Sequence, residues 1–386
     1  MRLLLVNYEY PPLGGGAGNA TANIAREMTL LGARVMVLTS AFRGLPRHET
    51  VQVPGGASFE IARIPTVRRH ADRCAAWEMA AFMASSCLTL PLAARAFRPD
   101  GAVAFFGIPG GPSAWILKAL AGTPYVVSLR GGDVPGFQPY DLAAMHRLTG
   151  PLIRFLWRRA LAVVPNSRGL AALARAFEPG LAYPVIPNGV DPERYAPRQG
   201  AREPGPMRLF FHGRVVRQKG LDVLVQALAQ LPRGLAWELS IAGDGPARPG
   251  LESQLRALGL ADRVRFLGWM DRADIALALR RADLFVFPSR DEGMPNAVLE
   301  AMASGLPVLA TAISGNEDLA LPGRTGLTVP PEDAGALAGA LARLLADPPL
   351  LEAMGREARA LVLEHYSWRS VAERYLALFG DRPCAA

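Results

Sequence analysis

Residues 285–305 carry the sequence FVFPSRDEGMPNAVLEAMASG, which predicts the local fold of the C-terminal half. A short apolar strand over residues 284–287 leads into a polar loop over residues 289–295. A helix is expected over residues 296–304, because Gly305 follows as a stop signal. A strand, a polar loop and a helix in this order are typical of a ligand site at the carboxyl edge of an α/β sheet.

Two carboxylates lie in this stretch, Glu292 in the loop and Glu300 in the helix. Between them, Gly293 and Pro295 are expected to hold the backbone open, so that a ligand can approach the peptide groups closely. A loop glutamate beside a helix start can instead complement the helix dipole. On these residues alone, a structural role and a binding role both stay open.

The composition indicates a globular cytoplasmic protein. Its 386 residues suit two domains, and half of them are hydrophobic. The net charge of +8 comes from scattered arginines and is compatible with phosphorylated ligands or anionic lipid. No nucleic-acid motif is present, so no nucleic-acid partner is expected. The cysteines Cys74, Cys87 and Cys384 lack metal-ligand spacing and indicate reduced thiols, and the short apolar N-terminus is unlike a signal peptide.

Residues 79–94 form the most apolar long stretch of the chain. The stretch is shorter than a membrane span requires and contains Pro91, which favours a buried or interfacial helix. Arg68 and Arg69, followed by Trp77, are also typical of a helix that lies on a membrane surface. We therefore expect a cytoplasmic protein that associates peripherally with an anionic inner-membrane face.

The chain opens with a βαβ unit. A strand over residues 2–6 precedes a glycine-rich loop over residues 14–18, a helix that begins at Asn19, and a strand over residues 35–39. The helix N-terminus can face an anion. Dinucleotide binding is not expected, because Asn19 takes the place of the third glycine and Ser40, not an acid, closes the second strand.

Three further strands are expected in this half, each followed by a turn-rich loop: residues 101–105, 125–129 and 162–165. Strands that alternate with helices predict a doubly wound parallel sheet. Such folds bind ligands at the strand ends, so Arg130, Asp133 and Asn166 are site candidates. Isolated residues of these types also commonly form turns or caps.

The best domain boundary follows the PNGVD turn at residues 187–191, because residues 192–206 are rich in Pro, Arg and Gly. The predicted parts are an N-terminal Rossmann-like domain over 1–191, a linker over 192–206, a C-terminal Rossmann-like domain over 207–365, and a last helix within 366–386 that crosses back onto the first domain.

The C-terminal domain opens with a strand over residues 208–211 and the loop HGRVVRQKG over residues 212–220. Arg214 and Lys219 in this loop suit a diphosphate, since Arg gives forked hydrogen bonds and Lys a point charge. A solvated basic loop is the alternative. Later strands (239–242, 264–267, 308–311) and helices (333–365, 368–379) repeat the α/β pattern. The predicted fold class is therefore α/β, with two doubly wound domains facing a central cleft.

The ordered motifs resemble glycosyltransferase family 4, which has the GT-B architecture. They are the glycine loop at 14–18, PNGVD at 187–191, the Arg214 and Lys219 loop, AGDGP at 242–246 and EGMPNAVLEAMASGLPV at 292–308. The resemblance spans nearly the whole chain and is strongest in the C-terminal half. It implies retaining transfer of a sugar from a nucleotide-diphosphate sugar to a hydroxyl of a glycan, a lipid-linked glycan or a small molecule.

The resemblance also implies the roles of the site residues. Arg214 and Lys219 would hold the donor diphosphate, Glu300 the ribose, and Glu292 the transferred sugar. The residues expected to bind substrate are Gly15, Gly16, Asp133, Asn166, Gly213, Gly243, Gly293, Met294, Pro295, Asn296, Ala297 and Glu300. Those expected to act in catalysis are Glu292, Arg214, Lys219 and Arg130.

Arg130 departs from the family pattern, because many relatives carry a histidine there; the arginine can donate to a phosphate or an acidic acceptor. The sequence contains no Asp-x-Asp, so neither a metal nor another cofactor is expected. The implied chemistry is front-face substitution in which the leaving phosphate helps to deprotonate the acceptor. Alternatives are a nucleotide-sugar epimerase of similar architecture and a non-catalytic scaffold.

Overall fold

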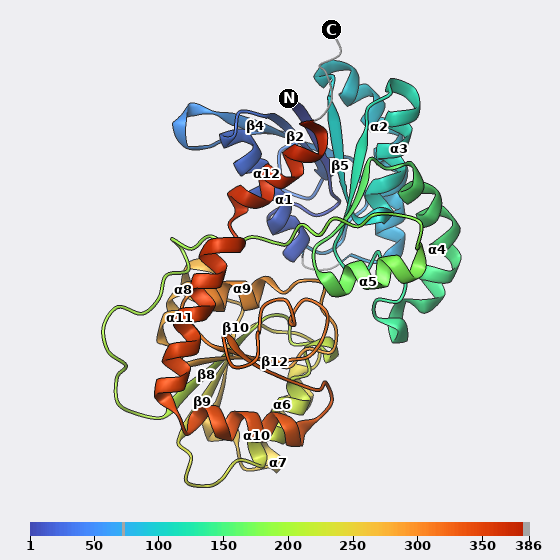
Figure 1. Cartoon of the computed structure of the whole chain (residues 1–386). Coiled ribbons are helices and arrows are strands. Elements are labelled where there is room, and N and C mark those ends of the chain that lie inside the picture. The colour runs from blue at the N-terminus through green and yellow to red at the C-terminus, as the bar shows by residue number, and fades with distance from the viewer. Residues whose placement is uncertain (72–73, 381–386) are drawn as a thin grey trace. The chain divides into compact units, whose positions relative to one another are not determined.

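The computed structural model describes residues 1–71 and 74–380, except for the side chains of residues 139–141. Cys384 and the end of the predicted region 366–386 lie outside the described residues. The chain divides into two compact units (Figure 1). Unit 1 contains Met1–Gly189 and the segment from Trp368 onward, and unit 2 contains Val190–Ser367.

Within the described residues, unit 1 has a seven-stranded sheet in the order β3-β4-β2-β1-β5-β6-β7. All neighbours pair in parallel except β3 and β4, which form an antiparallel edge. The strands are β1 Arg2–Val6, β2 Arg34–Ser40, β3 His48–Gln52, β4 Ser58–Ile64, β5 Gly101–Phe105, β6 Tyr125–Leu129 and β7 Ala162–Pro165. The sequence pattern does not indicate the edge hairpin, because its outer strand β3 is largely exposed and carries no apolar periodicity.

Helices cover both faces of this sheet (Figure 1). They are α1 Gly16–Leu30, α2 Ala76–Phe97, α3 Gly111–Ala121, α4 Pro139–Arg159, α5 Arg168–Phe177 and α12 Trp368–Gly380. Short helical turns lie at Pro54–Gly56 and Phe106–Gly110. Alternate residues of β1 enter different cores: Leu4 packs with α2 to α5, and Leu3 packs with α1 and α12. This two-sided burial explains why the strands are continuously apolar.

Unit 2 has a parallel six-stranded sheet in the order β10-β9-β8-β11-β12-β13 within the described residues. Its strands are β8 Met207–His212, β9 Trp237–Ala242, β10 Val264–Gly268, β11 Leu284–Phe287, β12 Val308–Thr311 and β13 Gly326–Val329. Its helices are α6 Leu221–Ala229, α7 Arg248–Ala257, α8 Arg272–Arg281, α9 Asn296–Ala303, α10 Ala334–Leu345 and α11 Pro348–His365, with short turns at Arg217–Lys219 and Ala261–Arg263. The predicted α/β class with two doubly wound domains is confirmed.

Helix α12 belongs to unit 1, although its sequence follows unit 2. The Tyr375 hydroxyl lies 2.7 Å from the Ser128 Oγ on β6, and Phe379 packs so closely on Gly101 of β5 that a Cβ there would lie 2.5 Å from its ring. At the start of the helix, Trp368 packs on Gly189, where a Cβ would lie 2.7 Å from the tryptophan ring. These two glycines are therefore required by packing.

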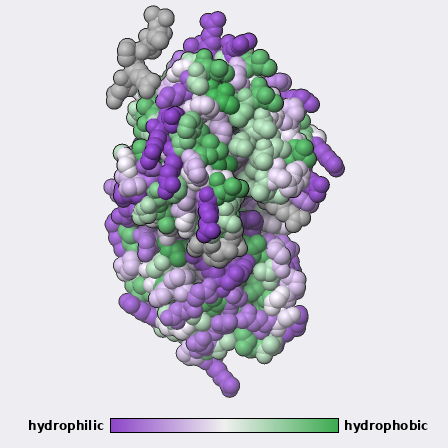
Figure 2. Space-filling view, turned by 90° about the vertical axis from the view of Figure 1, so that its right-hand side faces the viewer, coloured by the Kyte–Doolittle hydropathy of each residue, from purple (hydrophilic) through white to green (hydrophobic). Residues whose placement is uncertain are grey.

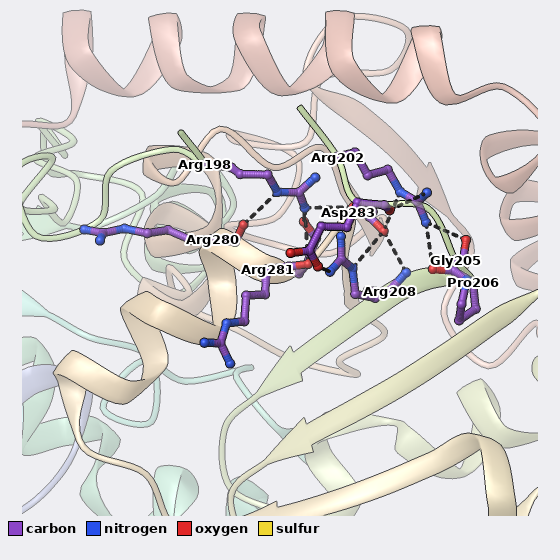
Figure 3. Close-up of polar contacts among 10 residues, drawn as sticks. Arg198, Arg202, Gly205, Pro206, Arg208, Arg280, Arg281 and Asp283 are labelled. Atoms are coloured by element: carbon purple, nitrogen blue, oxygen red, sulfur yellow. Dashed lines mark hydrogen bonds and ion pairs between the residues drawn. The ribbon is translucent and has the colours of Figure 1, made fainter. Parts of the chain in front are cut away.

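Residues 192–206, which the sequence indicates as a linker, lie in unit 2 and are bonded to it (Figure 3). Asp283, a buried carboxylate between α8 and β11, accepts hydrogen bonds from Arg198 at 2.8 Å and Arg202 at 3.0 Å. It also accepts from the backbone N–H of Arg208 at 2.9 Å. The Pro, Arg and Gly composition that suggests a linker instead reflects an irregular segment held by its arginines.

We predict that Asp283→Ala destabilises unit 2 by about 3 kcal/mol, because it leaves arginines unpaired at a mostly buried site. Burial alone would raise the pKa of Asp283, but the Arg208 N–H, Arg198 and Arg202 outweigh it and lower the pKa. The stabilisation is therefore present above about pH 4 and is lost as the pH falls through the lowered pKa. Urea unfolding at several pH values measures this.

The matched control is Arg324→Ala, which removes the exposed ion pair with Glu357. It should cost less than about 1 kcal/mol. Equal losses of stability in the two variants would contradict the structural role given to Asp283.

Candidate functional site

The candidate site lies at the carboxyl edge of the unit 2 sheet. Strands β8 and β11 are neighbours there, with Leu209 paired to Leu284 and Phe210 to Phe285. The loops that follow these two strands therefore leave the sheet side by side. One loop carries Lys219 in a short helical turn, and the other carries Glu292 before α9.

The two loops touch through backbone atoms. Gly220 has φ +63° and lies so close to the Pro288 carbonyl that a Cβ would meet its oxygen at 2.0 Å. Gly243, after β9, approaches the Gly213 carbonyl with the same closeness. Only glycine fits at these two positions.

Lys219 and Glu292 form an ion pair, and the side chains of both are largely buried. The Ser289 hydroxyl donates to the same Glu292 oxygen at 3.0 Å. The Lys219 ammonium also lies 5.0 Å from the centre of the Phe287 ring, within cation–π range. The structure thus brings together the predicted cation and the predicted loop carboxylate, which are 73 residues apart.

Glu300 projects from α9 toward the end of β8. Its Oε2 lies 3.3 Å from Nε2 of His212, and the Tyr195 hydroxyl is near enough to act on the pKa of its carboxyl group. Burial raises the pKa of Glu300 to about 7, although Tyr195 and the positive charges of Arg272 and Arg194 act in the opposite direction. Burial, and then the charge of Lys219, lowers the pKa of His212 to about 4, so this ring is neutral at pH 7.

The remaining predicted residues of unit 2 lie along the same edge. Gly213 directly follows β8 and Gly243 directly follows β9. Gly293, Met294 and Pro295 form the loop that leads into α9, and α9 begins at Asn296, followed by Ala297. Its positive end therefore points to the loop edge. Arg214, in the loop after β8, is exposed to solvent.

In unit 1 the predicted residues follow the ends of β1, β6 and β7. Gly15 caps α1 and its N–H donates to Glu9 at 3.3 Å, and Gly16 is the first residue of that helix. Asn166 is buried after β7, and its Oδ1 makes no hydrogen bond to the part of the chain that the structure describes.

Asp133 organises the loop after β6. Its carboxylate accepts from the backbone N–H groups of Gly107 at 2.8 Å, Arg130 at 3.0 Å and Gly131 at 3.1 Å. Burial raises the pKa of Asp133, and these N–H groups act against the rise. The geometry makes this residue a loop organiser within unit 1.

The Arg130 guanidinium is directed inward. Its Nη1 donates to Asn188 Oδ1 at 2.5 Å, its Nη2 lies 3.5 Å from the Tyr375 hydroxyl, and its Cζ lies 4.9 Å from the centre of the Phe105 ring. The side chain thus joins the β6 loop to the last turn of chain before unit 2 and to the returning helix α12.

Sequence reasoning missed His212, Tyr195 and Ser289 as parts of the site. Ser289 lies in the predicted polar loop over residues 289–295, and His212 lies in the predicted basic loop over residues 212–220. Their positions in these loops could have marked both as site residues. Tyr195 lies in the segment that the sequence indicates as a linker, where nothing marks a contact to Glu300 about a hundred residues later.

Comparisons with known proteins agree on one family. A family model described as "Glycosyl transferases group 1" matches residues 194–361, and one described as "Glycosyltransferase Family 4" matches residues 14–194. The chain is 31% identical to α-D-kanosaminyltransferase of Streptomyces kanamyceticus over 73% of its own length and 75% of the relative's. It is 28% identical to glycogen synthase of Mycobacterium tuberculosis, over 96% and 92%.

Two solved structures share the fold. Sucrose-phosphate synthase from Thermosynechococcus elongatus superimposes with a TM-score of 0.85, covers 98% of both chains and is 22% identical. HepE of Anabaena in complex with UDP and glucose superimposes with a TM-score of 0.75 at 19% identity, covering 99% of this chain and 100% of that one.

The raised pKa of Glu300 predicts a specific pH dependence of stability. Because the pKa is raised on folding, the protonated carboxyl favours the folded state, and this stabilisation is lost as the pH rises through about 7. Glu300→Gln, a permanently neutral replacement, should lose less stability than the native protein between pH 5 and pH 8. Urea unfolding of both proteins at pH 5 and pH 8 measures this difference in stability. If the native protein and Glu300→Gln lose the same stability between these pH values, folding does not raise the pKa of Glu300.

Proposed function

This chain belongs to glycosyltransferase family 4 and is a glycosyltransferase of the GT-B type, and we propose that it is a retaining enzyme that takes its sugar from a nucleotide-diphosphate sugar. The observation that carries the proposal is the convergence of Lys219, Glu292 and Glu300 at one sheet edge of unit 2. The presence of UDP and glucose in the HepE structure supports a donor of this class.

Each of these side chains takes one part of the donor in the proposal. Lys219 and Arg214 hold the diphosphate, with the positive end of α9 nearby. Glu300 accepts hydrogen bonds from the ribose hydroxyls, and Glu292 contacts the transferred sugar. Because Lys219 and Glu292 already form an ion pair, the diphosphate and the sugar would bind at adjacent positions on the two loops.

The proposed reaction is a front-face substitution. The bond between the anomeric carbon and the departing phosphate oxygen breaks, and the acceptor oxygen bonds to that carbon on the same face. The acceptor proton passes to the departing phosphate. Negative charge grows on the leaving diphosphate, and the fixed cations stabilise it there. Since side-chain cations provide this stabilisation, we propose that turnover needs no divalent metal.

Binding and transfer assays test the proposal. One of UDP, GDP or ADP should raise the melting temperature of the protein, because a ligand of the folded state stabilises it. The matching nucleotide sugars should then give a glycosylated acceptor with retained configuration, detected by mass spectrometry and NMR. Interconversion of the sugar without transfer would favour the epimerase alternative. Loss of transfer in excess EDTA, restored by Mn²⁺, would overturn metal independence.

We predict different effects for the two glutamates. The Glu300 contact with ribose is present in the ground state and the transition state alike, so Glu300→Ala should mainly weaken nucleotide affinity. The Glu292 contact changes as positive charge develops at the anomeric carbon, so Glu292→Ala should mainly lower kcat. Calorimetric titration with the nucleotide and initial-rate kinetics measure both effects. A Glu292 variant that loses nucleotide binding while the Glu300 variant keeps it would reverse the roles.

The acceptor proposal rests on an apolar and basic surface of unit 1, which we call the three-helix face. Its exposed apolar side chains are Trp77, Leu88 and Leu92 on α2, Leu120 on α3, and Leu148 and Leu152 on α4. Exposed cations on the same helices are Arg95, Lys118, Arg147, Arg154, Arg158 and Arg159. Figure 2 views unit 1 from the side on which α3 and α4 lie in Figure 1, and green apolar surface gathers there.

Among the described residues, helix α2 is long and apolar enough to cross a membrane when judged by length and composition alone. It instead packs Phe82 and Leu90 into the core of unit 1 and exposes its opposite side. Apolar side chains flanked by arginines complement an anionic lipid surface. We therefore propose a cytoplasmic enzyme that lies peripherally on the inner membrane face and glycosylates a lipid-linked acceptor.

Replacing Arg147 and Leu148 together by glutamates should weaken binding to vesicles that contain anionic phosphatidylglycerol. The change removes a positive charge that attracts the lipid and an apolar contact, and it adds two carboxylates that the anionic lipid repels. The native protein should bind these vesicles at low ionic strength and release them as salt screens the charges. Leu277→Glu, at an exposed leucine of unit 2, is the matched control and should bind as the native protein does. Sedimentation measures binding. Indifference of the native protein to anionic vesicles would indicate a soluble acceptor.

A further inference from the structure

Arg290 lies two residues before Glu292 and bridges two carboxylates. Its side chain is only 11% exposed. Nη1 and Nη2 donate to the two oxygens of Asp222 at 2.9 and 2.8 Å, which is a forked pair. Nη2 donates to Glu332 at 2.9 Å, Nε bonds the other oxygen of Glu332, and Nη1 also donates to the Arg217 carbonyl.

These partners belong to three different segments. Asp222 is in the first turn of α6, directly after the loop that carries Lys219, and Glu332 precedes α10. The main chain adds two bonds, from the Arg290 N–H to the Gln218 carbonyl at 2.7 Å and from the Gln218 side chain to the Asp291 carbonyl at 2.8 Å. The Glu292 loop is therefore bonded, through the two residues that precede Glu292, to residues on both sides of Lys219.

The chemistry of this junction requires an arginine. A planar guanidinium can donate to two carboxylates and a carbonyl at once, whereas a lysine ammonium is a single point charge. The side-chain hydrogen bonds to Asp222 and then Glu332 raise the pKa of Arg290, so the group stays charged. Glu332 has φ +62°, an uncommon conformation for a non-glycine residue, and its bond to Arg290 is one contact that holds it there.

We propose that Arg290 is a positioning residue for sugar transfer, which holds the Lys219 loop and the Glu292 loop in the register that both need to reach one donor. The inference rests on the function proposed above for Lys219 and Glu292. Among the described residues, Arg290 itself bonds only carboxylates and carbonyls, so it acts through the two loops.

Arg198 provides a matched comparison within unit 2. It also bonds a carboxylate and neighbouring carbonyls and is mostly buried, with 26% of its side chain exposed. Its partners, Asp283 and the end of α8, are not parts of the Lys219 or Glu292 loops. Loss of Arg198 therefore removes a similar stabilising group without touching the two loops.

The test compares Arg290→Ala, Arg290→Lys and Arg198→Ala at a temperature where circular dichroism shows all of them folded. Misplacing reacting groups by about 1 Å costs about a hundredfold in rate, so both Arg290 variants should lose kcat by about tenfold to a hundredfold, with a smaller change in donor KM. Arg198→Ala should lower the melting temperature and keep kcat. If the Arg290 variants do not fold, the milder Glu332→Gln replaces them, because it weakens the same junction at an exposed carboxylate that Arg290 bonds.

A double-mutant cycle with Lys219→Ala completes the test. If Arg290 acts by placing Lys219, its replacement should cost little further kcat once Lys219 is absent. Multiplicative losses, or an unchanged kcat for both Arg290 variants, would overturn the positioning role. If Lys219→Ala alone keeps kcat, the function proposed for the Lys219 loop fails instead, so the two failures are distinguishable.

Discussion

The adjacency of β8 and β11 in the unit 2 sheet is the constraint on which the site depends. Parallel pairing brings the ends of two strands, about 75 residues apart in sequence, to the same sheet edge. Gly220 then lets the two loops meet backbone to backbone at the Pro288 carbonyl. With the loops this close, a lysine side chain on one reaches a carboxylate on the other, and the ion pair of Lys219 and Glu292 follows from the sheet topology.

Arginine is the residue that fixes irregular backbone in both units. Arg198 and Arg202 hold residues 192–206 against Asp283, Arg290 joins two loops, and Arg130 joins the β6 loop to Asn188. In each case the forked guanidinium donates to oxygens from several segments at once. In a sheet or a helix, backbone N–H groups would satisfy such oxygens instead. Much of the basic composition that suggests an anionic partner is therefore used inside the protein. Exposed cations such as Arg214 and Arg147 remain for a partner, whereas Arg154 and Arg158 of the three-helix face pair with Glu178.

The sequence predicts periodic and local features well, and side-chain pairing poorly. Continuous apolar runs such as residues 284–287 predicted the strands, and the glycine stop predicted the end of α9. Tyr195, His212 and Arg290 were missed as a group because their partners lie 42 to 105 residues away along the chain and no periodicity relates them. The Pro, Arg and Gly composition of residues 192–206 was misleading for the same reason: a clamped segment and a free linker share that composition, and only the position of Asp283 separates them.

The charges at the site suit the diphosphate of the donor proposed above. Lys219 and Glu292 cancel each other, His212 is neutral because its pKa is lowered to about 4, and Glu300 is only partly ionised near pH 7 because burial raises its pKa. A fully ionised pair of glutamates would repel an anionic donor, whereas this arrangement leaves the edge close to neutral, with Arg214 exposed beside it. The same burial strengthens any hydrogen bond that the ionised Glu300 carboxylate accepts. A carboxylate whose pKa lies near neutrality thus suits the two roles proposed for this edge, admission of a diphosphate and recognition of a ribose.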